Sequence, residues 1–596
     1  MGFKSKTMKY LFLSFLSLLI TSCIYAQNTH SIHSTQLEYY NSLPNSDAAH
    51  YDSVVKPSSC DYYEKSGCQL NKVVYGWHPY WVGSVYQNYN WDLLSHFSFF
   101  SYEVNPTDGE PITTHGWSTS AAVGAALASG NTKVTLTVTL FSNHSTFFSS
   151  LTAQQTLITN LINLVQLRGA QGVNIDFEGL PSSYKTEFAN FMVDLCNQMH
   201  TAIPGSEIST VLYAVDWNNV FDFSIMEPAV DHYIIMGYAY YYQGSSSTGP
   251  CDPLYHFGSS YNYTLSKTIT YYLNKGCPKQ KLIMGLPYYG YQWPTSSSTI
   301  PSSTTGSGVA KTYRQIKNNS SGHYSAANHF FDLESYTDVY TFNNGGNYQC
   351  FITEESGFRK RLEHINTADI GGIGIWALGY DDGYNDFWYA IDDYLTDCYT
   401  DSCTNEIHDF GGPLKDYYNN EDYTWTIAPD SASALTFDFT FFDVEQNWDY
   451  LYIFDGNSVN APQISGSPFT GSIGPGIFTS STGAVTFRFY SDAATVSPGF
   501  TATYDCTINQ PTEISQHNTN EFSVFPNPAS TFISFSTEDV ASNFDLFIVD
   551  LYGKVVWRET AQNNTKLDIS SLASGYYFFG VGSMDNNKRM IPFVKD

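Results

Sequence analysis

Eight short apolar runs, separated by stretches long enough for helices, constrain the fold of this chain most. The runs cover residues 73–77, 96–101, 134–140, 172–178, 208–213, 232–237, 282–286 and 371–376. The stretch 149–168 carries leucines at helical spacing. Strands that alternate with helices over about 325 residues are typical of a closed parallel (β/α)8 barrel. We therefore predict an α/β fold of this type over residues 70–395, with an insertion after the seventh strand, between Trp293 and Phe351.

The C-terminal third changes character. Alternating strand-like segments dominate residues 404–506 and again 521–596, without a helix-length periodic segment. We expect two β-sandwich domains there, joined by a polar linker at 507–520.

The first residues are typical of an export signal. Lys4, Lys6 and Lys9 precede a short apolar run, which predicts a signal peptide over 1–26 and an N-terminal extension over 27–69. Cleavage after Ala26 would release a soluble protein. A lipoprotein signal with a lipidated Cys23 is the alternative. We see no later segment that is apolar and long enough to span a bilayer, so we expect none after cleavage.

Export makes disulfides expected among the nine cysteines that follow Cys23. Cys196 lies in a helix-like apolar pattern, which predicts a buried thiol. The other eight allow up to four bridges. Cys60–Cys68 is the expected local pair, although sequence does not fix connectivity.

The charge balance excludes some partners. The chain of 596 residues carries 27 basic against 56 acidic side chains, a net charge of −29, and 17% aromatic residues. Such a chain offers no broad basic face for phosphates, so we expect no nucleic-acid partner. An uncharged, aromatic-rich surface is compatible with a neutral polysaccharide.

The fourth run carries two carboxylates on one face. Side chains alternate along a strand, so Asn174, Asp176 and Glu178 would point into the barrel, with Glu178 nearest its mouth. Buried carboxylates are costly unless they are paired or used. At this separation one ionised carboxylate raises the pKa of its neighbour, and glycosidic cleavage requires a protonated acid beside an ionised partner.

The segment Gln171-Gly-Val-Asn-Ile-Asp-Phe-Glu178 resembles the catalytic strand of glycoside hydrolase family 18, whose pattern is D-G-x-D-x-D-x-E. Three further segments, 75–81, 236–238 and 285–290, resemble other strands of the family, as does 372–382. The resemblance implies a chitinase-like enzyme that needs no cofactor for catalysis.

The family implies substrate-assisted catalysis through an oxazolinium intermediate. By this resemblance Glu178 is the general acid and base, Asp176 supports the acetamido N–H, and Tyr238 holds the acetamido oxygen. The substrate-binding residues implied by the same motifs are Asn174, Trp376, Tyr75, Trp77, Met236, Tyr288 and Asp382.

The sequence departs from the family pattern. Asn174 stands where the family has an Asp, so it cannot share a proton with Asp176. Ala239 follows Tyr238, where an Asp is common. We expect a secreted chitinase. The alternatives are an N-acetylglucosaminidase acting on peptidoglycan or N-glycans, and a chitin-binding lectin, which the presence of both Asp176 and Glu178 disfavours.

Two further resemblances concern the β domains. The segments 410–414, 448–456 and 489–500 resemble a CUB domain, which implies a calcium site at Glu445, Asp449 and Asp492. The segments 522–530, 567–580 and 590–595 resemble the sorting domain of the Bacteroidetes type IX secretion system. This implies export across the outer membrane to the medium or the cell surface, with the secretion machinery as a partner.

Overall fold

The computed structural model of the chain describes residues 31–60, 67–258, 263–508, 522–537, 544–550, 554–562, 565–581 and 590–596. The expected signal peptide, Cys23 and most of the linker lie outside these residues. The described residues up to 508 form one compact unit, and those from 522 onward form a second.

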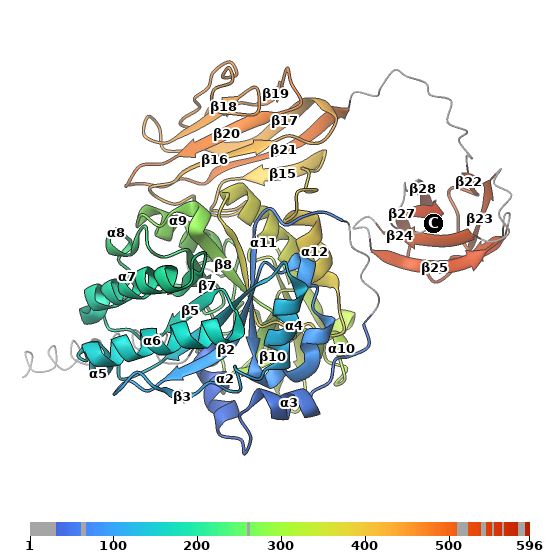
Figure 1. Cartoon of the computed structure of the whole chain (residues 1–596). Coiled ribbons are helices and arrows are strands. Elements are labelled where there is room, and N and C mark those ends of the chain that lie inside the picture. Colours follow the sequence, from blue (N-terminus) through green and yellow to red (C-terminus); the bar gives the residue numbers. More distant parts are fainter. Residues whose placement is uncertain are drawn as a thin grey trace, which may run out of the picture. The chain divides into compact units, whose positions relative to one another are not determined.

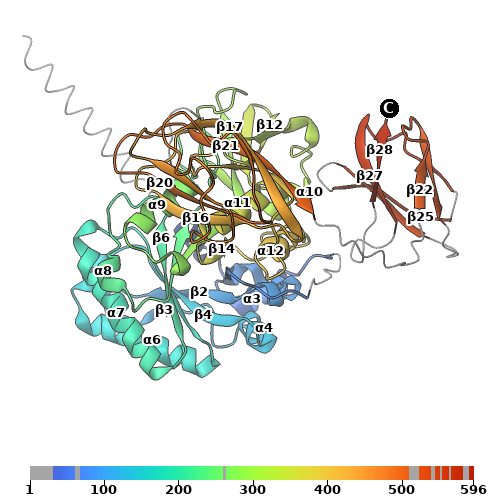
Figure 2. The same ribbon diagram turned by 90° about the horizontal axis from the view of Figure 1, so that it is seen from above.

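All eight predicted runs form the strands of a closed parallel barrel (Figures 1 and 2). The order is β1-β14-β8-β7-β6-β5-β4-β2, and β1 also pairs with β2 to close the ring. The strands are β1 (Val73–Pro79), β2 (His96–Val104), β4 (Lys133–Leu140), β5 (Gly172–Phe177), β6 (Glu207–Tyr213), β7 (His232–Met236), β8 (Leu282–Pro287) and β14 (Gly372–Trp376). The short β3 (Pro111–Thr113) pairs antiparallel with β2.

Helices connect these strands and surround them, as the view in Figure 2 shows for α6 and α7. The helix expected at 149–168 is α6 (Leu151–Arg168): the Ser150 side chain caps its first turn, and Gly169 ends it in a left-handed conformation. The other helices are α4 (Ala121–Ser129), α5 (His144–Phe148), α7 (Lys185–Ala202), α8 (Phe223–Met226), α9 (Leu265–Asn274), α10 (Tyr313–Asn318), α11 (Glu355–Ala368) and α12 (Asp386–Tyr394). Short 3-10 turns occur at η1 (Tyr80–Asn88), η2 (Trp91–Leu93), η3 (Ser182–Tyr184), η4 (Lys279–Lys281) and η5 (Ala326–Asn328).

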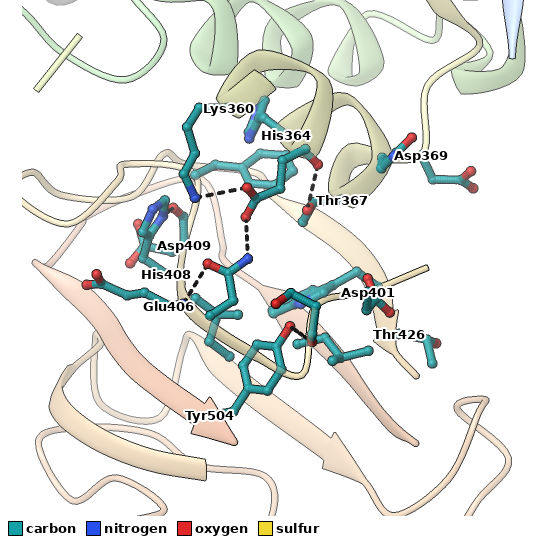
Figure 3. A pocket seen from close by; sticks show the side chains of 18 of the residues that line it. Lys360, His364, Thr367, Asp369, Asp401, Glu406, His408, Asp409, Thr426 and Tyr504 are labelled. Carbon is teal, nitrogen blue, oxygen red and sulfur yellow. Dashed lines mark hydrogen bonds and ion pairs between the residues drawn. The ribbon is translucent and has the colours of Figure 1, made fainter. Parts of the chain in front are cut away.

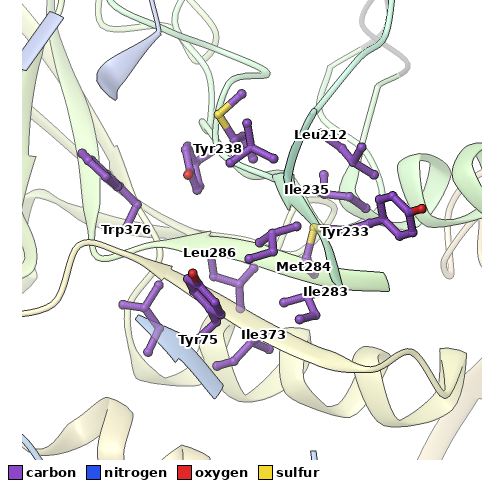
Figure 4. Packing of buried hydrophobic residues seen from close by; sticks show 14 of the residues in the cluster. Tyr75, Leu212, Tyr233, Ile235, Tyr238, Ile283, Met284, Leu286, Ile373 and Trp376 are labelled. Atoms are coloured by element: carbon purple, nitrogen blue, oxygen red, sulfur yellow. The ribbon is translucent and has the colours of Figure 1, made fainter. Parts of the chain in front are cut away.

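Neighbouring strands of the barrel share a buried apolar cluster. Ile235, Leu286 and Ile373, from three neighbouring strands, belong to one buried cluster with Tyr238 and Trp376 (Figure 4). The predicted insertion after β8 is a five-stranded antiparallel sheet. Its strands are β9 (Tyr289–Thr295), β10 (Val309–Thr312), β11 (His329–Asp332), β12 (Thr337–Asn343) and β13 (Asn347–Ile352).

The N-terminal extension forms two helices, α2 (Ile32–Asn41) and α3 (Ala48–Val54). Ser31 and Asp47 cap their first turns with side-chain oxygens. Tyr40 stacks on Trp81 of the barrel, with ring centroids 4.5 Å apart and planes 8° from parallel. The extension is therefore packed against the barrel rather than left as an open tail.

The region after the barrel forms the predicted sandwich of two antiparallel sheets, β15-β21-β17-β19 and β16-β20-β18. The strands are β15 (Thr404–His408), β16 (Asp422–Ile427), β17 (Ala432–Asp443), β18 (Tyr450–Phe454), β19 (Ile477–Thr479), β20 (Val485–Tyr490) and β21 (Gly499–Ile508). Their inner faces pack Phe437, Phe487 and Phe500 into its core.

The second unit consists of two small antiparallel sheets, β22-β23-β26 and β25-β24-β27-β28. Its strands are β22 (Phe522–Phe525), β23 (Phe532–Thr537), β24 (Phe544–Val549), β25 (Val555–Ala561), β26 (Lys566–Asp568), β27 (Gly575–Val581) and β28 (Met590–Lys595). Ile533, Phe535 and Phe579 lie in a core of its own. The prediction of a separate β domain is confirmed.

The expectation of disulfides is confirmed, but the expected local pair Cys60–Cys68 was wrong. Cys68 pairs with Cys398, 330 residues away, and not with Cys60, whose thiol instead donates to Asn385. A second bridge joins Cys403, directly before β15, to Cys506 on the neighbouring strand β21 of the same sheet. The predicted buried thiol of Cys196 is confirmed. Three more cysteines that could have formed bridges, Cys251, Cys277 and Cys350, are likewise buried thiols. Among the described residues, no helix combines the length and apolarity needed to cross a bilayer.

Candidate active site

The acidic residues of the fourth strand lie inside the barrel, on the face that alternation predicts. Asn174 and Asp176 are fully buried on β5, and Glu178, directly after the strand, is 6% exposed. Phe177 points the other way and packs against Phe147 and Phe191 of the outer helices. The alternation of β5 thus separates an apolar face from a carboxylate-bearing one.

Two hydrogen bonds fix the side chain of Asn174, which lies deeper in the barrel than the two carboxylates. Its Oδ1 accepts from Trp77 Nε1 at 2.9 Å, and its Nδ2 donates to Ser209 Oγ at 2.9 Å. The amide is therefore used in fixing Trp77. Asp176 Oδ1 is buried and has no hydrogen-bond partner among the described residues.

Three aromatic or apolar residues from neighbouring strand ends complete the pocket. Tyr238 follows β7 by two residues, Met236 ends β7, and Trp376 ends β14. Tyr238 and Met236 line a small cavity together with Glu178. The C-terminal ends of parallel barrel strands are where barrel enzymes place their chemistry.

The N-terminal extension enters this pocket. His33 of α2 is fully buried, with Nδ1 2.8 Å from Asp176 Oδ2 and Nε2 2.8 Å from the Tyr238 hydroxyl. Its ring lies on the Trp376 indole, with centroids 3.7 Å apart. A single imidazole therefore touches three of the predicted site residues at once.

Two more side chains of the extension contact the site. Ser31 Oγ donates to Glu178 Oε1 at 2.8 Å. Gln36 Oε1 accepts from Trp376 Nε1 at 3.1 Å and from the Tyr380 hydroxyl at 2.9 Å.

Electrostatics couple these groups. Burial and the neighbouring Asp176 raise the pKa of Glu178 to about 7, although hydrogen bonds from His33 and Ser31 oppose this. Burial alone would lower the pKa of His33, but Asp176 and Glu178 outweigh it and raise that pKa to about 9. His33 is therefore an imidazolium at neutral pH, and both of its ring nitrogens donate.

Three of the predicted substrate-binding residues, Tyr75, Tyr288 and Asp382, lie away from the pocket around Asp176 and Glu178. The Tyr75 hydroxyl lies 2.7 Å from Thr135 Oγ1, inside the barrel. Tyr288 packs among the outer helices, its ring centroid 4.4 Å from that of Phe387.

Asp382 holds the extension instead. Its carboxylate accepts from the Ser58 backbone N–H at 2.9 Å and from Asn88 Nδ2 at 2.7 Å, and it lies 3.0 Å from Arg314.

Sequence reasoning missed Ser31, His33 and Gln36. They lie in the expected extension, outside every motif, and no periodicity or spacing links them to the barrel. Only their contacts in the folded chain reveal them.

A larger cavity of about 370 Å³ lies between α11 and the sandwich (Figure 3). In its wall the Glu363 carboxylate accepts hydrogen bonds from Lys360 Nζ and from Asn405 Nδ2. None of the predicted site residues lines it, so its size does not mark it as the catalytic centre.

The predicted calcium ligands do converge in the sandwich. Oxygens of Glu445, Asp449 and Asp492 lie within 4.8 Å of one another. Asp449 is fully buried; it accepts from the Asp492 backbone N–H at 2.8 Å and from the Tyr417 hydroxyl. Glu445 Oε2 is buried and has no partner among the described residues. Three carboxylates, one with an orphaned oxygen, suit a hard cation such as Ca²⁺.

Comparisons with known proteins agree with this layout. The model of glycosyl hydrolases family 18 matches residues 62–381, that of the CUB domain 399–504, and that of the secretion system C-terminal sorting domain 523–592. The last match indicates secretion through the type IX system.

Curated relatives and solved structures are distant. Chitotriosidase-1 of Mus musculus is 23% identical over 250 residues, which cover 38% of this chain and 53% of the relative. The cortical fragment-lytic enzyme of Bacillus anthracis is 24% identical over 309 residues, 48% of this chain and 65% of the relative. The chain thus spans about half to two thirds of these relatives. The crystal structure of the Ostrinia furnacalis group IV chitinase aligns with a TM-score of 0.49 at 17% identity, covering 55% of this chain and all of that one.

Proposed function

Because the chain belongs to glycosyl hydrolases family 18, we propose that it is a secreted retaining hydrolase of β-1,4-linked N-acetylglucosamine polymers, of the chitinase type. The observation that carries the proposal is the convergence of Asp176, Glu178 and Tyr238 on one point. The His33 ring marks that point: it lies 2.8 Å from Asp176, 2.8 Å from Tyr238 and 3.4 Å from Glu178.

The proposed reaction begins with bond cleavage assisted by the substrate. Glu178, whose pKa burial and the neighbouring Asp176 raise, gives its proton to the glycosidic oxygen as the bond to C1 breaks. The carbonyl oxygen of the sugar's own 2-acetamido group bonds to C1 and forms an oxazolinium ion. Asp176 accepts a hydrogen bond from the acetamido N–H and balances the positive charge, while the Tyr238 hydroxyl holds the acetamido oxygen.

Water completes the proposed cycle. The Glu178 carboxylate takes a proton from water as the water oxygen bonds to C1 and the oxazolinium ring reopens. Two inversions at C1 leave the configuration retained, and one water is consumed for each bond cleaved. Trp376 supplies the apolar surface beneath the reacting sugar, and Met236 and Trp77 border the same space.

Product analysis by mass spectrometry tests this proposal. The chain is incubated with chitin oligomers, peptidoglycan and a high-mannose glycoprotein, each in large excess because His33 lies in the pocket. We expect shorter N-acetylglucosamine oligomers from the first substrate, and none when Glu178 is replaced by Gln. Products from peptidoglycan or the glycoprotein alone would favour the second candidate function, an N-acetylglucosaminidase acting on peptidoglycan or N-glycans. The likeness to a cortical fragment-lytic enzyme supports this second candidate. Binding without cleavage of any substrate would favour a lectin.

We also propose that the sandwich binds Ca²⁺ through Glu445, Asp449 and Asp492. The buried, unpartnered oxygen of Glu445 supports this, because a buried carboxylate oxygen is costly without a cation or donor. The ion would have a structural role remote from the reaction, and catalysis itself uses no cofactor.

A further inference from the structure

The segment 31–41 occupies the place where the reacting sugar has to bind. His33 fills the space between Asp176, Tyr238 and Trp376, and Ser31 donates to the acid Glu178. The cavity that remains beside Glu178 and Tyr238 is about 30 Å³. That space holds about two water molecules, at roughly 10–15 Å³ each. A sugar ring cannot enter while α2 is docked.

The contacts that His33 makes resemble those expected of the oxazolinium ion in the proposed reaction. An imidazolium is a flat, five-membered cation with an N–H directed at Asp176, and the oxazolinium ion of the proposed reaction is also a flat, five-membered cation with an N–H. The His33 ring lies on Trp376, where the sugar would stack, with ring planes 33° apart. Gln36 takes up the indole N–H of Trp376 and the hydroxyl of Tyr380. The segment therefore satisfies polar groups that the substrate would otherwise meet.

The attachment of the segment is noncovalent. Residues 31–56 contain no cysteine, so no disulfide holds them. Tyr40 stacks on Trp81, Tyr51 of α3 meets Tyr80 edge to face, and Ser84 donates to the Val55 carbonyl. The family model begins at residue 62, so the whole segment lies outside the part shared with the family.

We propose that residues 31–41 are an autoinhibitory plug, which closes the catalytic pocket in the intact chain and must leave it before substrate binds. The inference rests on the proposed function of the same site. Release requires only that α2 undock, or that the chain be cut before the barrel, since neither disulfide found among the described residues involves the plug.

A plug that competes with substrate raises KM and leaves kcat nearly unchanged, because the open fraction alone binds. Replacing His33 by Ala in the full-length chain removes the contacts to Asp176, Tyr238 and Trp376. We expect kcat/KM for a soluble N-acetylglucosamine oligomer to rise at least tenfold, mostly through KM. The matched control is Glu38→Ala, an exposed residue on the same helix, which should behave as the native chain. Equal kcat/KM for the native chain and His33→Ala would overturn the proposal.

A binding measurement separates the plug from the reaction. Calorimetry with the same oligomer is run on Glu178→Gln and on Glu178→Gln combined with His33→Ala. Tighter binding without His33, together with no hydrolysis by the His33→Ala chain, would support the plug and overturn the hydrolase. Hydrolysis with equal affinities would do the reverse, and no binding by either variant would overturn both. Should His33→Ala misfold, Gln36→Ala, whose side chain is only half-buried, replaces it with the same expected direction.

Discussion

The docking of His33 should depend on pH. The docked ring has a pKa of about 9, against 6.5 for a free histidine, which corresponds to about 3 kcal/mol at ~1.4 kcal/mol per pH unit. Because the docked pKa is the higher one, this contribution is fully present below pH 6.5 and is lost as pH rises through 9. With these two pKa values, the equilibrium constant for docking of His33 is roughly 80-fold smaller at pH 9 than at pH 6.5.

The groups that face His33 allow a direct assay. Asp176, Glu178 and Tyr238 surround its nitrogens, and burial with the two carboxylates holds the pKa of Tyr238 well above its ordinary value, so its hydroxyl stays neutral in this window. Glu178→Gln removes the titration of the acid itself. Oligomer affinity is then measured in this background from pH 6.5 to 9, with His33 present and with His33→Ala.

The ratio of the two dissociation constants reports docking at each pH. We expect it to fall at least tenfold between pH 6.5 and pH 9, less than the full ~80-fold because the Glu178→Gln background lacks one of the two carboxylates that raise the pKa of His33. Glu38→Ala in the same background should reproduce the fall. A ratio that stays constant, or that rises with pH, would refute the account of His33 as a charged plug.

Three further outcomes are expected. Glu178→Gln should fold normally and lose about 10³-fold or more of kcat, since it removes both acid and base steps; turnover near the native rate would contradict the assignment. Chelation with EDTA should lower the melting temperature of the sandwich transition in calorimetry, and an unchanged transition would argue against calcium at Asp449. Glu207→Gln should lower stability by about 1–3 kcal/mol in denaturant titration, because Glu207 joins His96, His232 and Lys133 at the opposite end of the barrel. An unchanged midpoint would show that this cluster contributes nothing.

Much of the barrel could be predicted from sequence because its signals are local. Each apolar run became a strand, and alternation alone placed Asp176 and Glu178 on the inner face. Tyr288 lies just past the end of β8, where alternation no longer fixes the direction of a side chain. It packs on the outer helices instead.

The rest depended on long-range geometry. Cys68 forms its disulfide with a cysteine 330 residues away in the sequence. A disulfide depends on the distance between two cysteines in the folded chain, which their separation in sequence does not reveal. His33 is 143 residues from Asp176, and its role depends on where α2 docks. A histidine in a polar extension has no sequence signal that distinguishes it from a solvated one.

The two disulfides within the described part of the chain close two consecutive covalent rings, residues 68–398 and 403–506, which are joined through the short stretch 399–402. In the chain-entropy description, closing the larger ring removes about 6 kcal/mol of unfolded-state freedom. A protease that nicks a loop inside either ring leaves both halves attached. A cut upstream of Cys68 falls outside both rings and can shed the N-terminal helices while the barrel remains closed. In the oxidised chain, a single cleavage in the stretch before the barrel can therefore remove the N-terminal helices and leave the barrel intact.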